Sequence, residues 1–170
     1  MPWKKYNPNP QGLSTGDCTI RAVCAVTGLD WNSAHTALCA LARDMADMPN
    51  TNRVWWEFLR AVGFRQLHLL DRCPDCFTVR DFAEANPKGV YVLGPHEHAV
   101  AVIDGEWWDN WDSGDTVPMY YFVKEDKNNG MEPDVPGGVS AGADAGMEQS
   151  ADVSAANDDA SDDPGGDRPG

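Results

Sequence analysis

Aromatic side chains are absent from residues 125–170, where Gly, Ala, Ser, Asp and Pro make up most of the sequence. All 7 Trp, 4 Tyr and 5 Phe of the chain precede this segment. Such a composition buries too little apolar surface to offset the entropy cost of ordering the backbone. We therefore expect two parts, a folded domain over residues 1–124 and a disordered acidic tail over residues 125–170.

A long apolar run and a secretory signal are also missing. No segment approaches the ~20 apolar residues of a membrane-spanning helix. The basic residues Lys4 and Lys5 are not followed by an apolar stretch. We expect a cytoplasmic protein with no membrane partner. In that reducing compartment the 5 Cys residues would not form a disulfide framework.

Basic residues do not cluster in this chain. The formal net charge is −14, and residues 125–170, with 12 acidic and 2 basic side chains, carry most of it. In residues 1–124, Lys4-Lys5 is the one adjacent basic pair, and no Gly-rich phosphate loop is present. Because phosphate contacts need a basic patch or stripe, we expect no nucleic-acid partner.

The spacing of apolar residues predicts alternating helical and strand segments. The helices cover residues 18–27, 31–46, 52–62 and 78–85, and the strands cover 64–70, 89–94, 98–103, 106–109 and 117–123. Asp17, Asp30 and Thr78 stand where N-cap residues are expected. Residues 1–16 lack periodicity and are predicted to form an irregular arm. This order predicts an α+β fold with N-terminal helices packed on an antiparallel β-meander.

The Asp-Gly pair at residues 104–105 is typical of a two-residue β-hairpin turn. Such a turn would pair Ile103 with Glu106 across the two strands. The same register, extended away from the turn, places His98 opposite Trp111. The hairpin therefore predicts the neighbours of His98 from the sequence alone.

Asp109 is the acid that this register brings to His98. Because side chains alternate along a strand, Asp109 would share the face of His98 and lie on its diagonal. A carboxylate there can accept a ring N–H, fix the tautomer and stabilise the imidazolium. Asp112 would lie on the other face unless a bulge intervenes. A half-buried histidine with a satisfied hydrogen bond is the alternative interpretation of His98.

Cys18 stands in the first turn of the first predicted helix. The positive end of the helix dipole and the unpaired N–H groups there favour a thiolate, which is the nucleophilic form. The same N–H groups can stabilise an oxyanion that forms beside the sulfur. A buried structural thiol is the alternative for Cys18, and Cys24 and Cys39, inside apolar helices, fit that alternative better.

Cys at the start of a helix, His opening a strand and an acid on the next strand form the chain order of papain-like cysteine peptidases. The Gly16-Asp17-Cys18 start resembles the bacteriocin-leader peptidases of this superfamily. Residues 7–123 also resemble small uncharacterised papain-fold proteins of phages and gut bacteria. Their shared motifs read here as Asn9-Pro10, Gly16-Asp17-Cys18, Met48-Pro49-Asn50, Cys73-Pro74-Asp75-Cys76 and Trp111-Asp112-Ser113.

The resemblance implies a cysteine hydrolase that cleaves a peptide, isopeptide or amide bond without a cofactor or a metal. Cys18 would be the nucleophile, His98 the general acid–base and Asp109 the residue that orients the imidazole. The substrate would be a protein or peptide. If the chain is encoded by a phage, its location would be the host cytoplasm.

This sequence departs from the family at the oxyanion position. Papain-like enzymes place a Gln about six residues before the Cys, and that position is Gly12 here. Gln11 and Asn9 are the amides within reach, and Asp112 is a candidate supporting residue behind the triad. The departure favours an alternative function, a catalytically inactive papain fold that serves as a protein-binding or virion-associated module.

The Cys-Pro-Asp-Cys motif suggests a third possibility, a small domain held by zinc. A structural zinc site has four ligands, and one Cys-x-x-Cys supplies two. The histidines that could complete it are His35, His68, His96 and His98. His96 and His98 could also form a metal pair, but no third ligand is evident.

Overall fold

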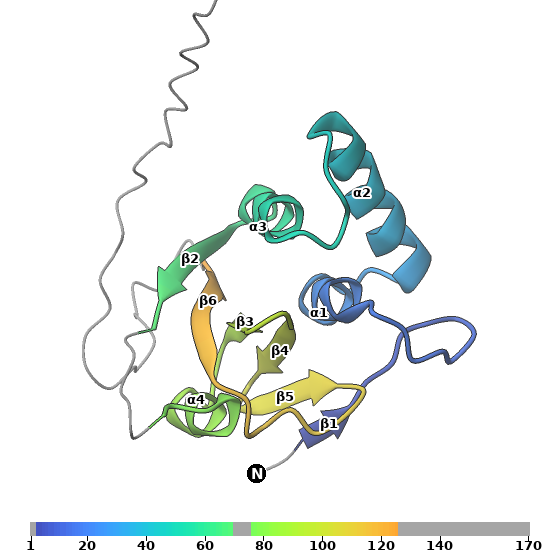
Figure 1. Cartoon of the computed structure of the whole chain (residues 1–170). Coiled ribbons are helices and arrows are strands. Elements are labelled where there is room, and N and C mark those ends of the chain that lie inside the picture. Colours follow the sequence, from blue (N-terminus) through green and yellow to red (C-terminus); the bar gives the residue numbers. More distant parts are fainter. Residues whose placement is uncertain (1–2, 70–75, 126–170) are drawn as a thin grey trace, which may run out of the picture.

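The computed structural model describes residues 3–69 and 76–125, which form four helices and six strands (Figure 1). In chain order these are β1 (Trp3–Lys5), α1 (Cys18–Thr27), α2 (Trp31–Asp44), α3 (Asn52–Ala61), β2 (Phe64–His68), α4 (Val79–Ala85), β3 (Val90–Pro95), β4 (Val100–Ile103), β5 (Glu106–Asp109) and β6 (Pro118–Lys124). The α+β class is confirmed. Of the predicted tail, Glu125 alone is described; residues 126–170 and Cys73 lie outside the described residues.

All six strands belong to one mixed sheet with the order β1-β5-β4-β3-β6-β2. The strands β3, β4 and β5 follow one another as a meander, as predicted. The strand β6 instead lies between β3 and β2, and β1 pairs with β5 in parallel. The prediction of a wholly antiparallel meander is therefore wrong at both edges of the sheet, where pairing joins segments far apart in sequence.

The predicted irregular arm over residues 1–16 contains a short edge strand. Trp3 lies opposite Trp107, and Lys5 lies opposite Asp109. The ammonium of Lys4 sits 3.5 Å from the centre of the Trp108 ring. Three residues are too few to display an alternating pattern, so this strand forms through long-range pairing that local sequence does not reveal.

Helices cover both faces of the sheet, with α1, α2 and α3 on one side and α4 on the other (Figure 1). Successive residues of the central strands contribute to opposite cores. Val92, Ala101 and Phe122 pack beneath the three helices. Tyr91, Val102 and Tyr121 pack toward α4. Both cores exclude water, and the core beneath the three helices holds α1 against β4, the strand that follows His98.

The ends of the helices follow the sequence signals closely. Gly28 adopts a left-handed conformation with φ of 76° and ends α1. The side chain of Asp30 accepts the backbone N–H of Ser33 at 3.0 Å, and Thr78 forms a reciprocal capping box with Asp81. Asp17 occupies the N-cap position of α1, but its side chain does not cap the helix.

The hairpin register is confirmed. Ile103 lies opposite Glu106, and the next pairs continue inward from the turn in the same register. Asp104 and Gly105 have positive φ angles of 50° and 79°, which two-residue hairpin turns require at both central positions. The strand itself begins at Val100, so His98 precedes β4 instead of opening it.

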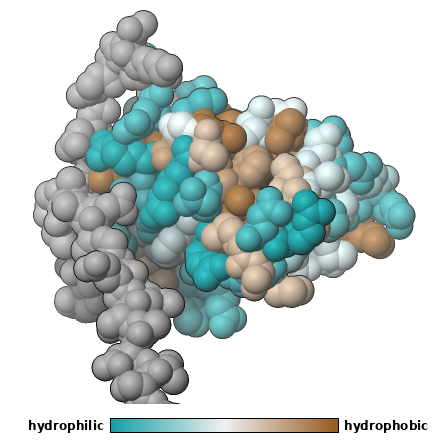
Figure 2. All heavy atoms as spheres, turned by 90° about the horizontal axis from the view of Figure 1, so that it is seen from above, coloured by the Kyte–Doolittle hydropathy of each residue, from teal (hydrophilic) through white to brown (hydrophobic). Residues whose placement is uncertain are grey.

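The surface of the described residues alternates polar and apolar side chains, as Figure 2 shows for the face over the helices. Large exposed apolar side chains come from separate segments of the chain: Leu13, Leu29, Met48, Val62, Trp111, Val117 and Met119. Single exposed apolar residues are normal on folded proteins. Among the residues described, no helix has the length and apolar character that crossing a bilayer requires.

Candidate active site

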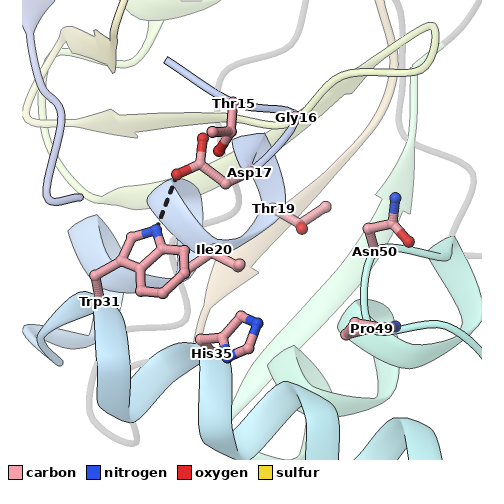
Figure 3. Close-up of a pocket in the computed structure, with 9 residues that line it drawn as sticks. All are labelled: Thr15, Gly16, Asp17, Thr19, Ile20, Trp31, His35, Pro49 and Asn50. Carbon is pink, nitrogen blue, oxygen red and sulfur yellow. Dashed lines mark hydrogen bonds between the residues drawn. The ribbon is translucent and has the colours of Figure 1, made fainter. Parts of the chain in front are cut away.

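Cys18 is the first residue of α1 and is half-buried. A pocket of about 300 Å³ opens beside it, between the start of α1, the first half of α2 and the segment before α3 (Figure 3). The thiol itself contacts His98 and Ala99, which lie just before β4 and do not line the pocket. Cys18 therefore lies at the junction of the helical layer and the sheet.

The surroundings of Cys18 lower the pKa of its thiol. Burial acts to raise this pKa, but the hydrogen bond and the charge of His98 act against it, and the net shift is downward. The backbone N–H of Ala99 and the positive charge of Arg21 add to the lowering. A thiolate is thus favoured at Cys18 in a site that is still partly open to solvent.

His98 lies in a tight turn where its backbone N–H bonds to the Pro95 carbonyl at 3.0 Å. Its Nε2 donates to Oδ2 of Asp109 at 2.6 Å, so Nδ1 is the ring nitrogen left for Cys18. Burial lowers the pKa of His98, but the bonds and charges of Asp109 and Cys18 outweigh it and raise the pKa to about 9. The arrangement favours an imidazolium beside a thiolate.

Asp109 is 2% exposed, and each of its carboxylate oxygens has partners. Oδ2 accepts from His98, while Oδ1 accepts the N–H of Asn110 at 2.8 Å and Nη2 of Arg21 at 3.3 Å. Burial acts to raise the pKa of Asp109, yet the hydrogen bond and charge of His98 lower it on balance. The acid is therefore held ionised in one orientation.

The arm before α1 fixes the backbone of Asp109. The indole Nε1 of Trp3 and the backbone N–H of Tyr6 both donate to the Asp109 carbonyl, at 3.1 Å and 2.8 Å. Asn110 extends this contact by donating its side-chain amide to Ser14 Oγ at 2.8 Å. The strand β1 and the arm thus brace the acid from the outer edge of the sheet.

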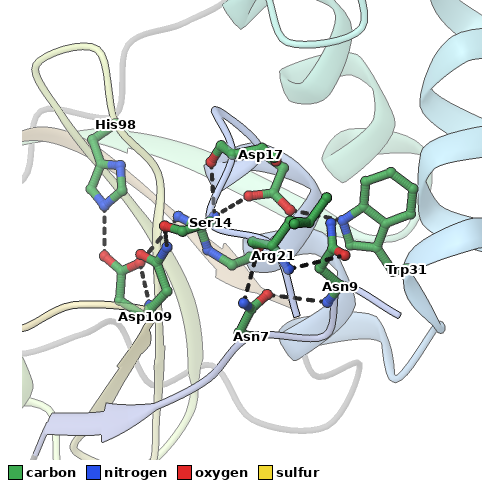
Figure 4. A network of polar contacts seen from close by, with 11 residues as sticks. Asn7, Asn9, Ser14, Asp17, Arg21, Trp31, His98 and Asp109 are labelled. Atoms are coloured by element: carbon green, nitrogen blue, oxygen red, sulfur yellow. Dashed lines mark hydrogen bonds and ion pairs between the residues drawn. The ribbon is translucent and has the colours of Figure 1, made fainter. Parts of the chain in front are cut away.

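The sequence analysis did not identify Arg21, which links α1, the helix that begins at Cys18, to Asp109. Its side chain is 5% exposed and bridges Oδ1 of Asp17 to Oδ1 of Asp109 (Figure 4). The other oxygen of Asp17 accepts Nε1 of Trp31 at 2.9 Å. This network explains why Asp17 does not cap α1, because its carboxylate is turned toward Arg21 and Trp31.

A signal for Arg21 was present in the sequence. Arg is almost never buried unless paired, and Arg21 stands in a helix whose other residues are mostly small or apolar. It also lies four residues after Asp17, which is the spacing of an intrahelical ion pair. What local sequence cannot supply is the second partner, Asp109, 88 residues further along the chain.

Trp111 covers the imidazole from the solvent side. The centres of the His98 and Trp111 rings are 5.5 Å apart, and the indole is 47% exposed. The predicted proximity of these two residues is confirmed. The indole therefore packs next to the imidazole at the surface of the site.

The two candidate oxyanion amides, Asn9 and Gln11, belong to the arm that precedes α1. Oδ1 of Asn9 accepts the backbone N–H of Gln11 at 2.9 Å and is therefore engaged in folding the arm. Among the described residues, neither Asn9 nor Gln11 forms a hydrogen bond with Cys18. Gly12 has a φ of +65°, a conformation in which a glutamine or any other residue with a side chain would be strained.

Asp112 serves another part of the fold. Its Oδ1 accepts Nε1 of the buried Trp107 at 3.0 Å and the N–H of Gly114 at 3.1 Å. The structure thus brings Cys18, His98 and Asp109 together and leaves Asp112 outside the group. Within residues 3–69 and 76–125, no three His, Cys, Asp or Glu side chains are grouped as metal ligands would be.

Comparison of the chain with protein-family models, curated proteins and solved structures finds no match. The evidence for the chemistry of the site therefore comes from its own residues. Those residues are a half-buried thiol, an imidazole that contacts it, and a buried carboxylate that holds the imidazole.

Proposed function

We propose that residues 1–124 form a papain-like cysteine hydrolase that cleaves a peptide, isopeptide or amide bond with Cys18, His98 and Asp109. The observation that carries this proposal is the bond of 2.6 Å between His98 Nε2 and Asp109 Oδ2. It leaves the second ring nitrogen to Cys18, whose pKa is lowered. Neither a structural cysteine nor an isolated buried histidine requires this chain of three groups.

The resting state of the site is an ion pair of a Cys18 thiolate and a His98 imidazolium. The thiolate attacks the carbonyl carbon of the substrate, a C–S bond forms, and the carbonyl electron pair moves to oxygen. When the tetrahedral intermediate collapses, His98 gives its Nδ1 proton to the departing nitrogen and the C–N bond breaks. The products of this half-reaction are an amine and a thioester on Cys18.

Water resolves the thioester in the second half-reaction. The now neutral His98 accepts a proton from water as the oxygen attacks the thioester carbon. The C–S bond breaks, a carboxylic acid leaves, and the ion pair is restored. Asp109 keeps its charge throughout, so it orients the imidazole and stabilises the imidazolium in both steps.

Backbone N–H groups of the first turn of α1 are the donors that could stabilise the oxyanion. The first intrahelical bond joins the N–H of Arg21 to the carbonyl of Asp17, so the preceding N–H groups have no helical partner. Since the Asp17 side chain caps none of them, they are available to a substrate oxygen next to the sulfur. One such donor is worth about 3 kcal/mol in the transition state.

The experiment that tests this proposal is alkylation of the whole chain with iodoacetamide near neutral pH, with each modified cysteine identified by mass spectrometry. We expect Cys18 to react at least ~10-fold faster than Cys39, which is also half-buried. Equal rates at the two thiols would show that Cys18 is not an activated nucleophile and would contradict the proposed hydrolase.

Gly12, at the position where papain-like enzymes place a Gln, favours a second candidate, an inactive fold that binds a protein. Alkylation separates the two, because a binding module has no need of an activated thiol. If Cys18→Ala retained binding to a partner while the unmodified chain showed no turnover and no selective alkylation, the binding module would be the better account.

A further inference from the structure

The pocket beside Cys18 has walls from three elements. Figure 3 shows Trp31 and His35 on one side, Pro49 and Asn50 on the other, and Thr19 between them on α1. The indole and imidazole rings are stacked, with centres 4.8 Å apart and planes 10° apart. Its volume of about 300 Å³ is at the lower end for ligand pockets and suits one large side chain.

The position of the pocket ties it to the reacting sulfur. Asp17 and Thr19, the residues on either side of Cys18, both line it. Consecutive Cα atoms are about 3.8 Å apart, so the pocket begins within one residue of the nucleophile. His98, which would protonate the leaving group, contacts the thiol and is not among the residues that line the pocket. A substrate residue on the acyl side of the cleaved bond would therefore reach this pocket.

No unpaired charge lines the pocket. Asp17 is the one carboxylic acid among its lining residues, and both of its side-chain oxygens are engaged, one by Arg21 and the other by Trp31. A lysine side chain would find no free carboxylate there, and a glutamate would lie next to the Asp17 charge. The remaining walls, chiefly Ile20, Trp31 and Pro49, are suited to an apolar stem.

Thr19 gives the pocket an unsatisfied polar group. The residue is 4% exposed, and its Oγ1 is buried with no hydrogen-bond partner among the described residues. Buried hydroxyls nearly always have a partner. Threonine in a helix uses two χ1 positions, so this hydroxyl can turn from the helix backbone to a ligand. The exposed side-chain amide of Asn50 stands across the pocket at its rim.

We infer that this pocket selects, on the acyl side of the cleaved bond, a long uncharged side chain that ends in a carboxamide, as glutamine does. This inference rests on the proposed function. The methylene stem packs between Ile20 and Trp31, and the amide group exchanges hydrogen bonds with the Thr19 hydroxyl and the Asn50 amide. A hydroxyl and an amide each donate and accept, and a carboxamide matches both.

The test uses peptidyl vinyl sulfones on the full chain. In this reaction the Cys18 thiolate adds to the vinyl carbon that is bonded to the Xaa Cα, the C=C π bond breaks, and the carbon next to the sulfone takes the His98 proton. Acetyl-Gly-Xaa and acetyl-Xaa-Gly probes, with Xaa as Gln, Met, Glu or Lys, place the side chain next to the reacting carbon or one residue away. We expect kinact/KI for Gln to exceed that for Met by about 10-fold in one of the two series.

Variants assign this selectivity to the pocket. Thr19→Val and Asn50→Leu should each bring the ratio of Gln to Met close to 1, whereas Thr19→Ser should keep most of it. Thr36→Val, on the exposed face of α2, is the matched control and should retain the full ratio. If Thr19→Val does not fold, Asn50→Leu at the exposed rim still decides the question.

The two proposals fail in different ways. Equal rates for the four probes, or faster reaction of Glu or Lys, would overturn the carboxamide pocket while leaving the activated thiol intact. Failure of every probe and of iodoacetamide to select Cys18 over Cys39 would overturn the hydrolase itself. Loss of Gln selectivity in Thr36→Val would also contradict the assignment to Thr19.

Discussion

Two thiols on α1, Cys18 in the first turn and Cys24 in the middle of the helix, have opposite pKa shifts. Burial raises the pKa of Cys24 to about 11, and the negative charge of Asp30 adds to the effect. Burial also acts to raise the pKa of Cys18, but His98, Ala99 and Arg21 outweigh burial and lower this pKa on balance. The same functional group is thus inert in one turn of a helix and activated in another.

The comparison shows that burial acts to raise the pKa of both thiols and that the neighbours of each thiol decide the direction of the net shift. Cys24 is 1% exposed and touches the apolar core beneath the helices. Cys18 also packs on that core, yet its outer side meets an imidazole held by a buried acid. Activation therefore depends on residues from the far end of the sequence, which the sheet brings against the start of α1.

The largest expected effect comes from removing the cation that links the two sides of the site. Arg21→Met leaves the buried carboxylates of Asp17 and Asp109 without their shared partner. Breaking a buried ion pair costs about 3–5 kcal/mol of stability. We expect the urea midpoint to fall accordingly. Arg43→Met, at a side chain that is 80% exposed, should change stability by less than about 0.5 kcal/mol. Equal losses in the two variants would contradict the network.

The next effect is on the reactivity of the activated thiol. His98→Ala removes the group whose bond and charge lower the Cys18 pKa, while the opposing effect of burial stays. We expect alkylation of Cys18 at pH 7 to slow by roughly 100-fold. His96→Ala, in the exposed part of the same loop, should leave the rate unchanged. A rate that is insensitive to His98→Ala would show that the helix start alone activates Cys18.

A smaller effect is expected on the imidazole when its acid is neutralised. The Asp109 carboxylate opposes burial and raises the pKa of His98, which is about 9. Asp109→Asn removes that charge, so the pKa of His98 should fall below ~8. Ring-proton NMR shifts recorded against pH measure this directly. Asp112→Asn, whose carboxylate bonds to Trp107, is the matched control and should leave the His98 pKa at its original value.

The smallest effect sharpens the contrast between the two thiols. Cys24→Ala removes one buried sulfur from a packed core and should cost about 1 kcal/mol of stability. The alkylation rate of Cys18 should stay within twofold of the unmodified chain, because Cys24 is not among the groups that shift the Cys18 pKa. A large change in that rate would mean that the positions of Cys18 and Cys24 on the helix are coupled through packing.

Local signals predicted the parts of the site that depend on short stretches of sequence. The Asp-Gly turn fixed the register of β4 and β5, and this register placed Asp109 and Trp111 beside His98. The start of α1 at Cys18 followed from its apolar spacing and from Gly28 at its end. Turn and helix signals of this kind act over a few residues and can be read from the sequence.

The remaining features depend on contacts between distant segments. The strand β1 pairs in parallel with β5, which lies about 100 residues later in the sequence. No alternating pattern within Trp3–Lys5 predicts this pairing. The expected cap at Asp17 was displaced because Arg21 and Trp31 offer its carboxylate stronger partners than the helix backbone. The arm also holds Asn9 in a turn of its own, in which its Oδ1 accepts the backbone N–H of Gln11, and local sequence does not announce this turn.

The most direct test is an ultraviolet titration of the Cys18 thiolate, taken as the difference between the unmodified chain and Cys18→Ser. We predict a midpoint clearly below ~8.5, the ordinary value of a free cysteine. In His98→Ala the midpoint should rise to that value or above it, because burial raises the pKa of Cys18 and the hydrogen bond and charge of His98 that lower it are gone. A midpoint at or above ~8.5 in the unmodified chain would contradict the ion pair on which the proposed chemistry depends.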